Sequence, residues 1–334
     1  MKKKNFYVIT KTPLRVSFVG GGTDLPFFYK KKYGLVVSTT INKFVYVSVK
    51  SHDRLFKENY RLNYSSTEHI KGGMDKIKNK IVRACLKYMN IHVPLNINIS
   101  SDLPASTGLG SSSAIIVGLL KALHALTNKN ISTSELAEKA CKVEINILKN
   151  PIGKQDQYSA SFGGFRSYKF KKDESVQIEK KNNKIVQKIL KNSLFLWLDN
   201  FKDSKKILFD QKKNFFKKRN HYLKLLNIAK NVNENFKKKK FKLNDFALKL
   251  NENWKIKREL SKFITNKKID NLYKDSISKG ALAGKVLGAG NGGFLMILTN
   301  SKKLKKLKKY FKKKAIYDFS FYKFGSKIIY KKTY

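Results

Sequence analysis

The segment Gly108-Leu109-Gly110-Ser111-Ser112-Ser113 constrains the fold most, because it joins a turn at residues 102–104 to an apolar helix predicted over 112–126. Glycines let backbone amides approach a phosphate closely, and the start of a helix adds unpaired N–H groups and a positive dipole end. The serine hydroxyls can cap the helix, bind a phosphate oxygen or coordinate Mg²⁺, so a simple serine cap is the alternative interpretation. The segment is not a Walker A loop, since no Gly-Lys-Ser/Thr sequence ends it.

A second glycine cluster, Gly288-Ala289-Gly290-Asn291-Gly292-Gly293, matches the G-x-G-x-x-G pattern of dinucleotide-binding folds. That pattern requires a strand, then the glycines, then a helix, whereas these glycines lead into a strand predicted over 294–298. We interpret the cluster as a loop that lets the backbone of the second half approach a ligand held by the first half. A glycine-rich hairpin turn is the alternative.

Helical periodicity places Glu144 where a carboxylate is not expected. A helix is predicted from Ser132 to about Asn150. When its residues are placed at about 100° per residue, the apolar ones form one continuous arc, and Glu144 lies near the middle of that arc. The arc consists of Leu136, Ala137, Ala140, Cys141, Val143, Ile147 and Leu148. A buried carboxylate is costly without a partner, so we predict that a metal ion or a basic group faces Glu144. An ordinary surface glutamate is the alternative.

Two aspartates lie in polar turns. Asp156 stands between two glutamines just after the predicted helix ends, a setting suited to orienting a hydroxyl nucleophile, or else to capping the next helix. Arg15 lies in an apolar strand. Three glycines, residues 20–22, follow that strand and place Thr23 and Asp24 in a tight turn. Such a turn can offer Asp24 to sugar hydroxyls; a plain type I turn is the alternative.

The charge of the chain suggests a nucleic-acid binder at first sight. Lysine and arginine number 72 against 23 acids, a formal net charge of +49, but only seven of the 72 are arginine. Surfaces that read bases or clamp phosphates favour the planar fork of arginine. We therefore predict a solvated lysine coat with no specific nucleic-acid partner, and genuine polyanion affinity is the alternative.

The cysteine content and the hydropathy of the sequence argue against further classes of protein. Cys85 and Cys141 are the two cysteines, too few for a disulfide scaffold or a cysteine zinc site. No apolar stretch follows the basic start, and none reaches 18 residues, so we expect a cytoplasmic protein with no membrane partner. The sequence gives no indication of the oligomeric state.

Strands and helices mix in both halves without a regular βαβ repeat, which predicts an α+β fold. We expect strands over 6–19, 36–49, 95–99, 194–198, 294–298 and 315–322, and a hairpin that joins 162–165 to 176–180. A helix is predicted over 74–90, and two or three helices follow the strand at 194–198. The predicted domains are residues 1–188 and 189–334.

Together these segments resemble the GHMP small-molecule kinase superfamily over nearly the whole chain. Its three motifs occur in order: the N-terminal strand and turn, the Pro-x3-Gly-Leu-Gly-Ser-Ser loop at 104–112, and the C-terminal glycine loop. Residues 13–26, 38–47 and 152–158 are most similar to the D-glycero-D-manno-heptose 7-phosphate kinases. The resemblance implies a ribosomal-protein-S5-domain-2-like N-terminal domain and a ferredoxin-like C-terminal domain.

The resemblance also implies a function. It implies ATP-dependent, Mg²⁺-dependent phosphorylation of the anomeric C1 hydroxyl of the heptose 7-phosphate to the 1,7-bisphosphate, for nucleotide-activated heptose. The alternatives are a 1-kinase for a free sugar such as fucose or galactose, and a catalytically silent polyanion-binding relative. ATP would be bound by Pro104, Gly108, Leu109, Gly110, Ser111, Ser112 and Ser113, and Mg²⁺ by Ser112 and Glu144.

The remaining implied roles concern catalysis and the sugar. Asp156 would be the catalytic aspartate with Arg15 beside it, and the substrate would be bound by Asp24, Thr23, Gly22, Lys43, Lys154, Gly290 and Gly292. Two departures from the relatives stand out. Gly21-Gly22 replaces the Glu-His of the galactokinase signature, which suggests a roomier sugar site. Lys202 stands where the heptose kinases carry an arginine, which loses bidentate geometry toward a phosphate.

Overall fold

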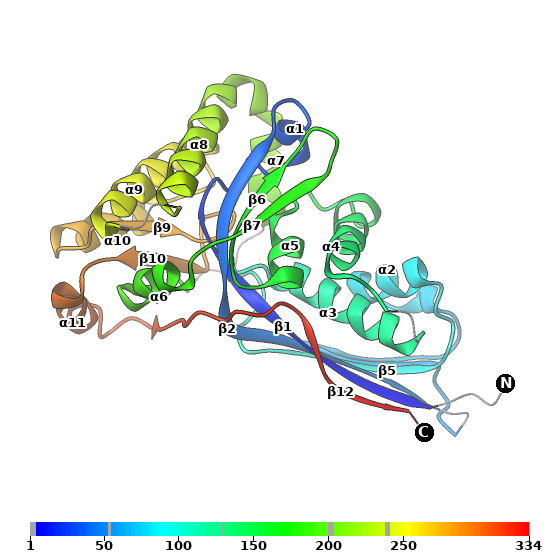
Figure 1. Cartoon of the computed structure of the whole chain (residues 1–334). Coiled ribbons are helices and arrows are strands. Elements are labelled where there is room, and N and C mark those ends of the chain that lie inside the picture. The colour runs from blue at the N-terminus through cyan, green and yellow to red at the C-terminus, as the bar shows by residue number, and fades with distance from the viewer. Residues whose placement is uncertain (1–4, 53–54, 128–129, 200–203, 238–240, 334) are drawn as a thin grey trace.

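The chain folds around two antiparallel-rich sheets (Figure 1), and the computed structural model describes residues 5–52, 55–127, 130–199, 204–237 and 241–333. In the described chain, an eight-stranded sheet runs in the order β12-β1-β2-β5-β3-β4, with β6 paired to β2 and β7 to β6. A four-stranded sheet runs β11-β8-β10-β9. The fold is α+β with two domains, as predicted.

The strands have the following bounds: β1 Phe6–Val19, β2 Gly34–Ser51, β3 Tyr60–Asn63, β4 Thr67–Ile70, β5 Leu95–Ser101, β6 Phe165–Phe170, β7 Val176–Lys180, β8 Ser193–Trp197, β9 Ala283–Val286, β10 Phe294–Leu298, β11 Ile316–Tyr317 and β12 Lys327–Thr333. The long strands β1 and β2 form the centre of the large sheet. In the small sheet, β10 is buried along its whole length.

The helices have these bounds: α1 Pro26–Tyr29, α2 Lys80–Met89, α3 Ser111–Leu126, α4 Thr133–Cys141, α5 Gln155–Phe162, α6 Asn183–Lys191, α7 Ser204–Lys213, α8 Phe215–Asn235, α9 Leu243–Glu259, α10 Lys267–Ser278 and α11 Ser301–Tyr310. A short 3₁₀ turn covers Met74–Lys76. Helices α2 to α5 lie on one side of the large sheet, and α9 and α10 pack against β9 of the small sheet (Figure 1). Helix α8 packs against α9 and against the long strands β1 and β2.

Helix α3 is apolar on nearly all sides because it is packed between the large sheet and its neighbouring helices. Gly118 allows the closest approach: the Thr10 hydroxyl donates to its carbonyl oxygen at 3.0 Å. A Cβ at this position would lie 2.8 Å from the Thr12 Oγ1 atom, inside contact distance. The packing fixes the start of α3, and with it the first glycine loop, relative to β1.

The structure corrects some of the predicted elements. The helix predicted over 132–150 is divided, because α4 ends at Cys141 and a π-helical turn, Lys142–Ile147, follows. Of the strand predicted over 315–322 only Ile316–Tyr317 forms. Strands β3, β4 and β12 were not predicted.

The last strand crosses back to the first sheet. β12 pairs with β1 in antiparallel register, Phe6 opposite Thr333, although its residues fall within the range that we assigned to the C-terminal domain. The boundary at 188/189 stays a prediction.

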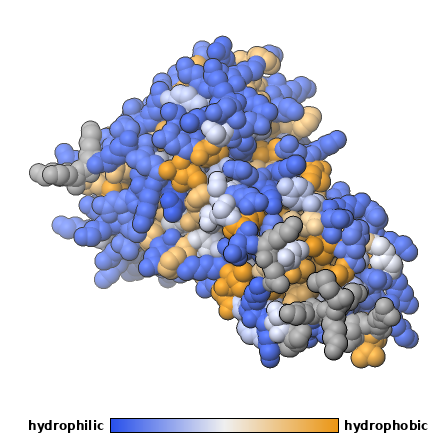
Figure 2. All heavy atoms as spheres, turned by 45° about the vertical axis from the view of Figure 1, so that its right-hand side comes forward, coloured by the Kyte–Doolittle hydropathy of each residue, from blue (hydrophilic) through white to orange (hydrophobic). Residues whose placement is uncertain are grey.

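The surface agrees with the hydrophilic composition, since hydrophilic side chains cover most of the face in Figure 2. In the described part of the chain, no helix is both long and apolar enough to cross a membrane.

Candidate active site

Two hollows meet between the domains. The larger, the loop cleft, encloses about 1460 Å³ including space open to solvent, and the first glycine loop, Glu144 and the second glycine loop line it. The smaller, the turn pocket, spans about 660 Å³, likewise including space open to solvent, and is lined by the N-terminal glycine turn, Asp24 and the start of α5. Both hollows are lined by Arg15, Ile152, Asp156, Leu208, Gly288 and Ala289.

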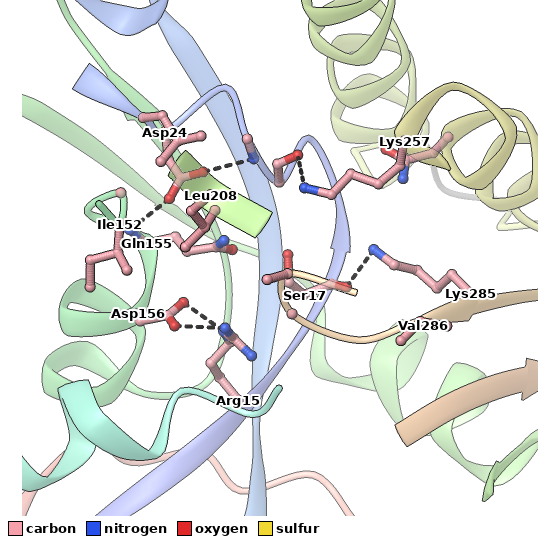
Figure 3. Close-up of a pocket in the computed structure, with 17 residues that line it drawn as sticks. Arg15, Ser17, Asp24, Ile152, Gln155, Asp156, Leu208, Lys257, Lys285 and Val286 are labelled. Carbon is pink, nitrogen blue, oxygen red and sulfur yellow. Dashed lines mark hydrogen bonds and ion pairs between the residues drawn. The ribbon is translucent and has the colours of Figure 1, made fainter. Parts of the chain in front are cut away.

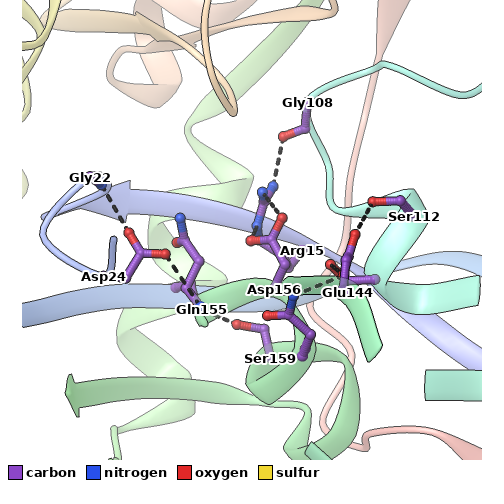
Figure 4. A network of polar contacts seen from close by, with 12 residues as sticks. Arg15, Gly22, Asp24, Gly108, Ser112, Glu144, Gln155, Asp156 and Ser159 are labelled. Carbon is purple, nitrogen blue, oxygen red and sulfur yellow. Dashed lines mark hydrogen bonds and ion pairs between the residues drawn. The ribbon is translucent and has the colours of Figure 1, made fainter. Parts of the chain in front are cut away.

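An ion pair marks the junction of the two hollows (Figures 3 and 4). Arg15 Nε donates to Asp156 Oδ1 at 2.7 Å, and Arg15 Nη2 donates to Asp156 Oδ2 at 2.6 Å. The third guanidinium nitrogen, Nη1, donates to the Gly108 carbonyl oxygen at 2.6 Å. Arg15 is 4% exposed, so its short bonds hold the aspartate of α5 and the first glycine loop in fixed positions.

The two glycine loops, widely separated in the sequence, contact each other through their backbones. Gly108 has φ +78°, and a Cβ there would lie 2.4 Å from the Leu287 carbonyl oxygen. Gly293 has φ +73°, and a Cβ there would lie 2.2 Å from the Thr107 carbonyl oxygen. Side chains at these positions would push the loops apart, so both glycines are required for the closed wall of the cleft.

Gly290 and Gly292, which we predicted to bind substrate, both line the loop cleft. In the described chain neither lines the turn pocket. The second loop therefore faces the same hollow as the start of α3.

The start of α3 leaves backbone donors free for an anion. Gly110 is the N-cap residue with φ +81°, and no side chain of the described structure caps this end. Ser111 and Ser112 line the loop cleft. Of the other residues predicted to bind ATP, Leu109 is buried in the core, Ser113 turns to Glu144, and Pro104 is exposed.

Glu144 is fully buried, as its position on the apolar arc predicted. Its carboxylate accepts from Ser112 Oγ at 2.7 Å, from Ser113 Oγ at 2.6 Å and from Gln157 Nε2 at 2.8 Å. Burial raises the pKa of Glu144, and these three hydrogen bonds oppose the rise. The three donors are neutral, so the charge of Glu144 has no basic partner among them.

The donor set at Glu144 suits a magnesium ion. Carboxylate and hydroxyl oxygens are the hard ligands that Mg²⁺ prefers, and the ion usually takes its other ligands from phosphates and water. Glu144 and Ser112 both line the cleft, so a cation between them would compensate the buried charge. In the described chain no group of three or more His, Cys, Asp or Glu residues forms a cage made by the protein alone.

Asp24 lines the turn pocket and is 2% exposed. Its carboxylate accepts from the backbone N–H of Gly22 at 2.9 Å and of Gln155 at 3.3 Å. Burial raises the pKa of Asp24, while these backbone hydrogen bonds lower it. Gly153 makes the contact possible, because a Cβ there would lie 2.0 Å from Asp24 Oδ2.

Thr23, which we predicted to bind substrate, makes its hydrogen bonds within the protein. Its hydroxyl donates to the Gly20 carbonyl oxygen at 2.8 Å and accepts from the Leu35 N–H at 3.0 Å, which fixes the turn from inside. In the described structure it does not line the turn pocket, whereas Gly22 does.

Sequence reasoning missed two buried lysines of the turn pocket. Lys257 Nζ donates to the Gly21 carbonyl oxygen at 3.2 Å, and Lys285 Nζ donates to the Ser17 and Phe18 carbonyl oxygens at 2.9 and 2.7 Å. Burial lowers the pKa of Lys257 to about 8 and that of Lys285 to about 7.

A signal for Lys257 was present in the sequence. The buried face of α9 consists of Phe246, Ala247, Leu250, Asn253, Trp254 and Lys257. Lys257 thus continues a stripe at helical spacing, and the periodicity argument that found Glu144 would have found it too.

The two lysines that we predicted to bind substrate lie elsewhere. Lys154 Nζ donates to the Glu174 carbonyl oxygen at 2.9 Å and lies 5.1 Å from the centre of the Tyr29 ring. Lys43 is a half-buried residue of β2, and neither lysine lines the loop cleft or the turn pocket of the described structure. Lys202 lies outside the described residues.

Comparison with known proteins gives two family matches and a relative similar along almost the whole chain. The model of the GHMP kinases N terminal domain matches residues 76–164, and that of GHMP kinases C terminal matches residues 232–316. D-glycero-alpha-D-manno-heptose 7-phosphate kinase of Campylobacter jejuni is 29% identical over 95% of this chain and 97% of its own.

Two solved structures share the fold. The crystal structure of a D-glycero-D-manno-heptose 1-phosphate kinase from Bacteroides thetaiotaomicron has a TM-score of 0.76 at 21% identity, covering 96% of this chain and 97% of that chain. Lactococcus lactis galactokinase complexed with galactose has a TM-score of 0.74 at 15% identity, covering 96% and 95%. The two family matches, the similarity to the heptose kinase along almost the whole chain and the shared fold lead to one conclusion: this chain belongs to the GHMP kinase superfamily, whose members are ATP-dependent kinases.

Proposed function

We propose that this protein is a sugar kinase that transfers the γ-phosphoryl group of ATP to the anomeric C1 hydroxyl of D-glycero-D-manno-heptose 7-phosphate, giving the 1,7-bisphosphate. The observation that carries the proposal is the Arg15–Asp156 pair at the junction of two hollows, where a donor and an acceptor can meet. The heptose substrate is supported by the relative that is similar over 95% of the chain.

The loop cleft suits the nucleotide. The uncapped start of α3 directs backbone N–H groups toward the cleft, and the helix dipole adds a positive potential for phosphate oxygens. Ser112 and Glu144 would hold Mg²⁺, which supplies charge neutralisation on the phosphates when bound. Gly108 and the second glycine loop close the wall beside these groups.

The turn pocket suits the acceptor. Asp24 offers carboxylate oxygens to sugar hydroxyls, and its backbone hydrogen bonds fix its position. Asp156 would orient the C1 hydroxyl and accept its proton as the new bond forms. Arg15 positions Asp156 and adds positive charge where negative charge develops on the transferred group.

The test is ³¹P NMR of the purified protein with ATP, Mg²⁺ and D-glycero-D-manno-heptose 7-phosphate, with galactose, fucose and mannose in parallel samples. A new anomeric phosphate signal on the heptose alone is the expected result. Transfer only to a free sugar would keep the kinase and overturn the heptose substrate. No transfer to any of the four would overturn the sugar kinase proposal.

A further inference from the structure

The turn pocket contains buried polar groups that have no partner in the described structure. Ser17 Oγ and Gln155 Oε1 are buried and make no hydrogen bond there, although both residues line the pocket. Ser17 is 4% exposed, so its hydroxyl has little access to solvent. Buried polar atoms are normally satisfied, so these two atoms are available to a polar ligand of this pocket.

Lys257 is an incompletely paired cation that lines the pocket. An ammonium carries three N–H donors, and Lys257 Nζ makes one hydrogen bond in the described structure, to the Gly21 carbonyl oxygen. Figure 3 shows the side chain reaching from α9 toward the glycine turn. A Cβ at Gly22 would lie 3.5 Å from Nζ, so the absence of a side chain at Gly22 leaves room beside the ammonium.

The charges around Lys257 leave a positive excess. Arg15 is paired with Asp156, and Asp24 is the remaining carboxylate of the pocket lining. Lys285 adds a second buried ammonium from β9. Asp24 favours the charged form of Lys257 and Arg15 opposes it, while the charge of Lys257 disfavours the charged form of Lys285. An anion bound in the pocket beside Lys257 would offset this positive excess.

We propose that Lys257, supported by Lys285, binds a phosphate group of the acceptor substrate in the turn pocket and thereby makes the enzyme select a phosphorylated sugar. The inference rests on the proposed function and deepens it, because the phosphate meant is the 7-phosphate, which is not transferred. Both lysines line the turn pocket and, in the described chain, neither lines the loop cleft. Their anion is therefore distinct from the phosphates of ATP.

The competing explanation is that Lys257 only clamps the glycine turn to α9. The two roles differ in the acceptors for which a substitution of Lys257 changes the KM. A clamp would disturb every acceptor alike, whereas a phosphate ligand discriminates between D-glycero-D-manno-heptose 7-phosphate and the free heptose.

The experiment compares the wild-type enzyme with Lys257→Met and with a matched control, Lys181→Met. Lys181 is also a buried lysine, 5% exposed, but it pairs with Glu179 at 2.8 Å outside both hollows. A charge-assisted hydrogen bond to phosphate typically accounts for a change of about 30-fold, so we expect Lys257→Met to raise the KM for heptose 7-phosphate about 30-fold. The KM for ATP and for the free heptose should stay within about threefold, and Lys181→Met should leave all three unchanged.

Three kinetic outcomes would overturn the inference. One is an equal rise in KM for the phosphorylated and the free heptose in Lys257→Met. Another is a wild-type enzyme that uses both acceptors equally well. The third is a rise with Lys154→Met and none with Lys257→Met, which would return the phosphate to the lysine that sequence reasoning chose.

A binding measurement keeps the test independent of the proposed function. If the wild type phosphorylates neither heptose, the function fails, and inorganic phosphate is titrated by calorimetry into protein saturated with a non-hydrolysable ATP analogue and Mg²⁺. Weaker phosphate binding in Lys257→Met than in Lys181→Met would support the anion site. Equal binding in both variants, or none in the wild type, would overturn it. The same titration also serves if Lys257→Met loses stability, provided that the variant still binds the nucleotide analogue. In that case Ser17→Ala, which removes an unpaired hydroxyl, is the milder variant. We expect it to raise the KM for heptose 7-phosphate about threefold.

Discussion

Replacing Asp156 with Asn should separate the structural role of the buried ion pair from its role in turnover. The variant keeps the shape of the side chain but leaves the Arg15 guanidinium without its countercharge. The two side chains are 5% and 19% exposed. Removing one partner of a buried pair costs about 3–5 kcal/mol, and Arg15 keeps its bond to the Gly108 carbonyl oxygen, so we expect a loss of about 3 kcal/mol. By the usual scaling for a chain of 334 residues, the melting temperature would fall by about 4 °C.

Turnover should respond differently from stability. We expect Asp156→Asn to lower kcat at least about 100-fold, equivalent to about 2.7 kcal/mol of transition-state stabilisation. ATP affinity should stay within a few-fold, because the first glycine loop remains held by Arg15. The measurements are a coupled kinase assay, nucleotide titration and thermal unfolding of the same protein preparation.

The double variant Arg15→Met/Asp156→Asn is the decisive control. It removes both charges, so at least about half of the lost stability should return, while kcat stays as low as in Asp156→Asn. Wild-type turnover in Asp156→Asn would refute the catalytic assignment. A double variant no more stable than Asp156→Asn would refute the assignment of the loss to an unpaired guanidinium.

Three further predictions concern the metal, the loops and pH. Glu144→Gln should raise the Mg²⁺ concentration for half-maximal activity at least about tenfold, since a neutral amide is a weaker ligand than a carboxylate; an unaltered Mg²⁺ titration would count against it as a ligand. Gly108→Ala should lower the free energy of unfolding by about 1–2 kcal/mol and weaken ATP binding. Gly108 has a positive φ, and the new Cβ would lie 2.4 Å from the Leu287 carbonyl oxygen, just before the second glycine loop. Gly73→Ala is its control in thermal unfolding and nucleotide titration, as nothing lies within 4 Å of its Cβ position, and equal losses in both would contradict the reasoning. Finally, kcat/KM for heptose 7-phosphate should fall as pH rises through about 7 to 8, where Lys285 and Lys257 lose their protons, and Lys257→Met should flatten the upper part of that decline. A pH profile identical for the free heptose would contradict this origin.

The elements with the strongest periodicity were predictable from the sequence. The apolar run of α3, the alternation in β2 and the position of Glu144 on an apolar helical face are all patterns that repeat within a single element. Their side-chain pattern is imposed by the helix or strand itself, which is why a single sequence carries the signal. The family motifs could be recognised for the same reason, since each is a short continuous segment.

Elements without a local signal could not be predicted. Strand β12 is exposed along its length and rich in lysine, and it forms because its backbone pairs with β1 from the opposite end of the chain. The π-helical turn at Glu144 was missed because the apolar pattern continues through it, and the three donors to its carboxylate, Ser112, Ser113 and Gln157, come from other elements.

By itself the sequence determined which groups can do chemistry: a carboxylate on an apolar helix face, aspartates in polar turns, and glycines where a backbone must come close. Only the tertiary structure decided which of these groups share a site. It joined Arg15 to Asp156 across 141 positions, closed the two glycine loops against each other, and put Lys257 rather than Lys154 into the turn pocket. The physical reason is that periodicity reports which face of an element is buried, whereas the partner buried against that face is set by long-range packing.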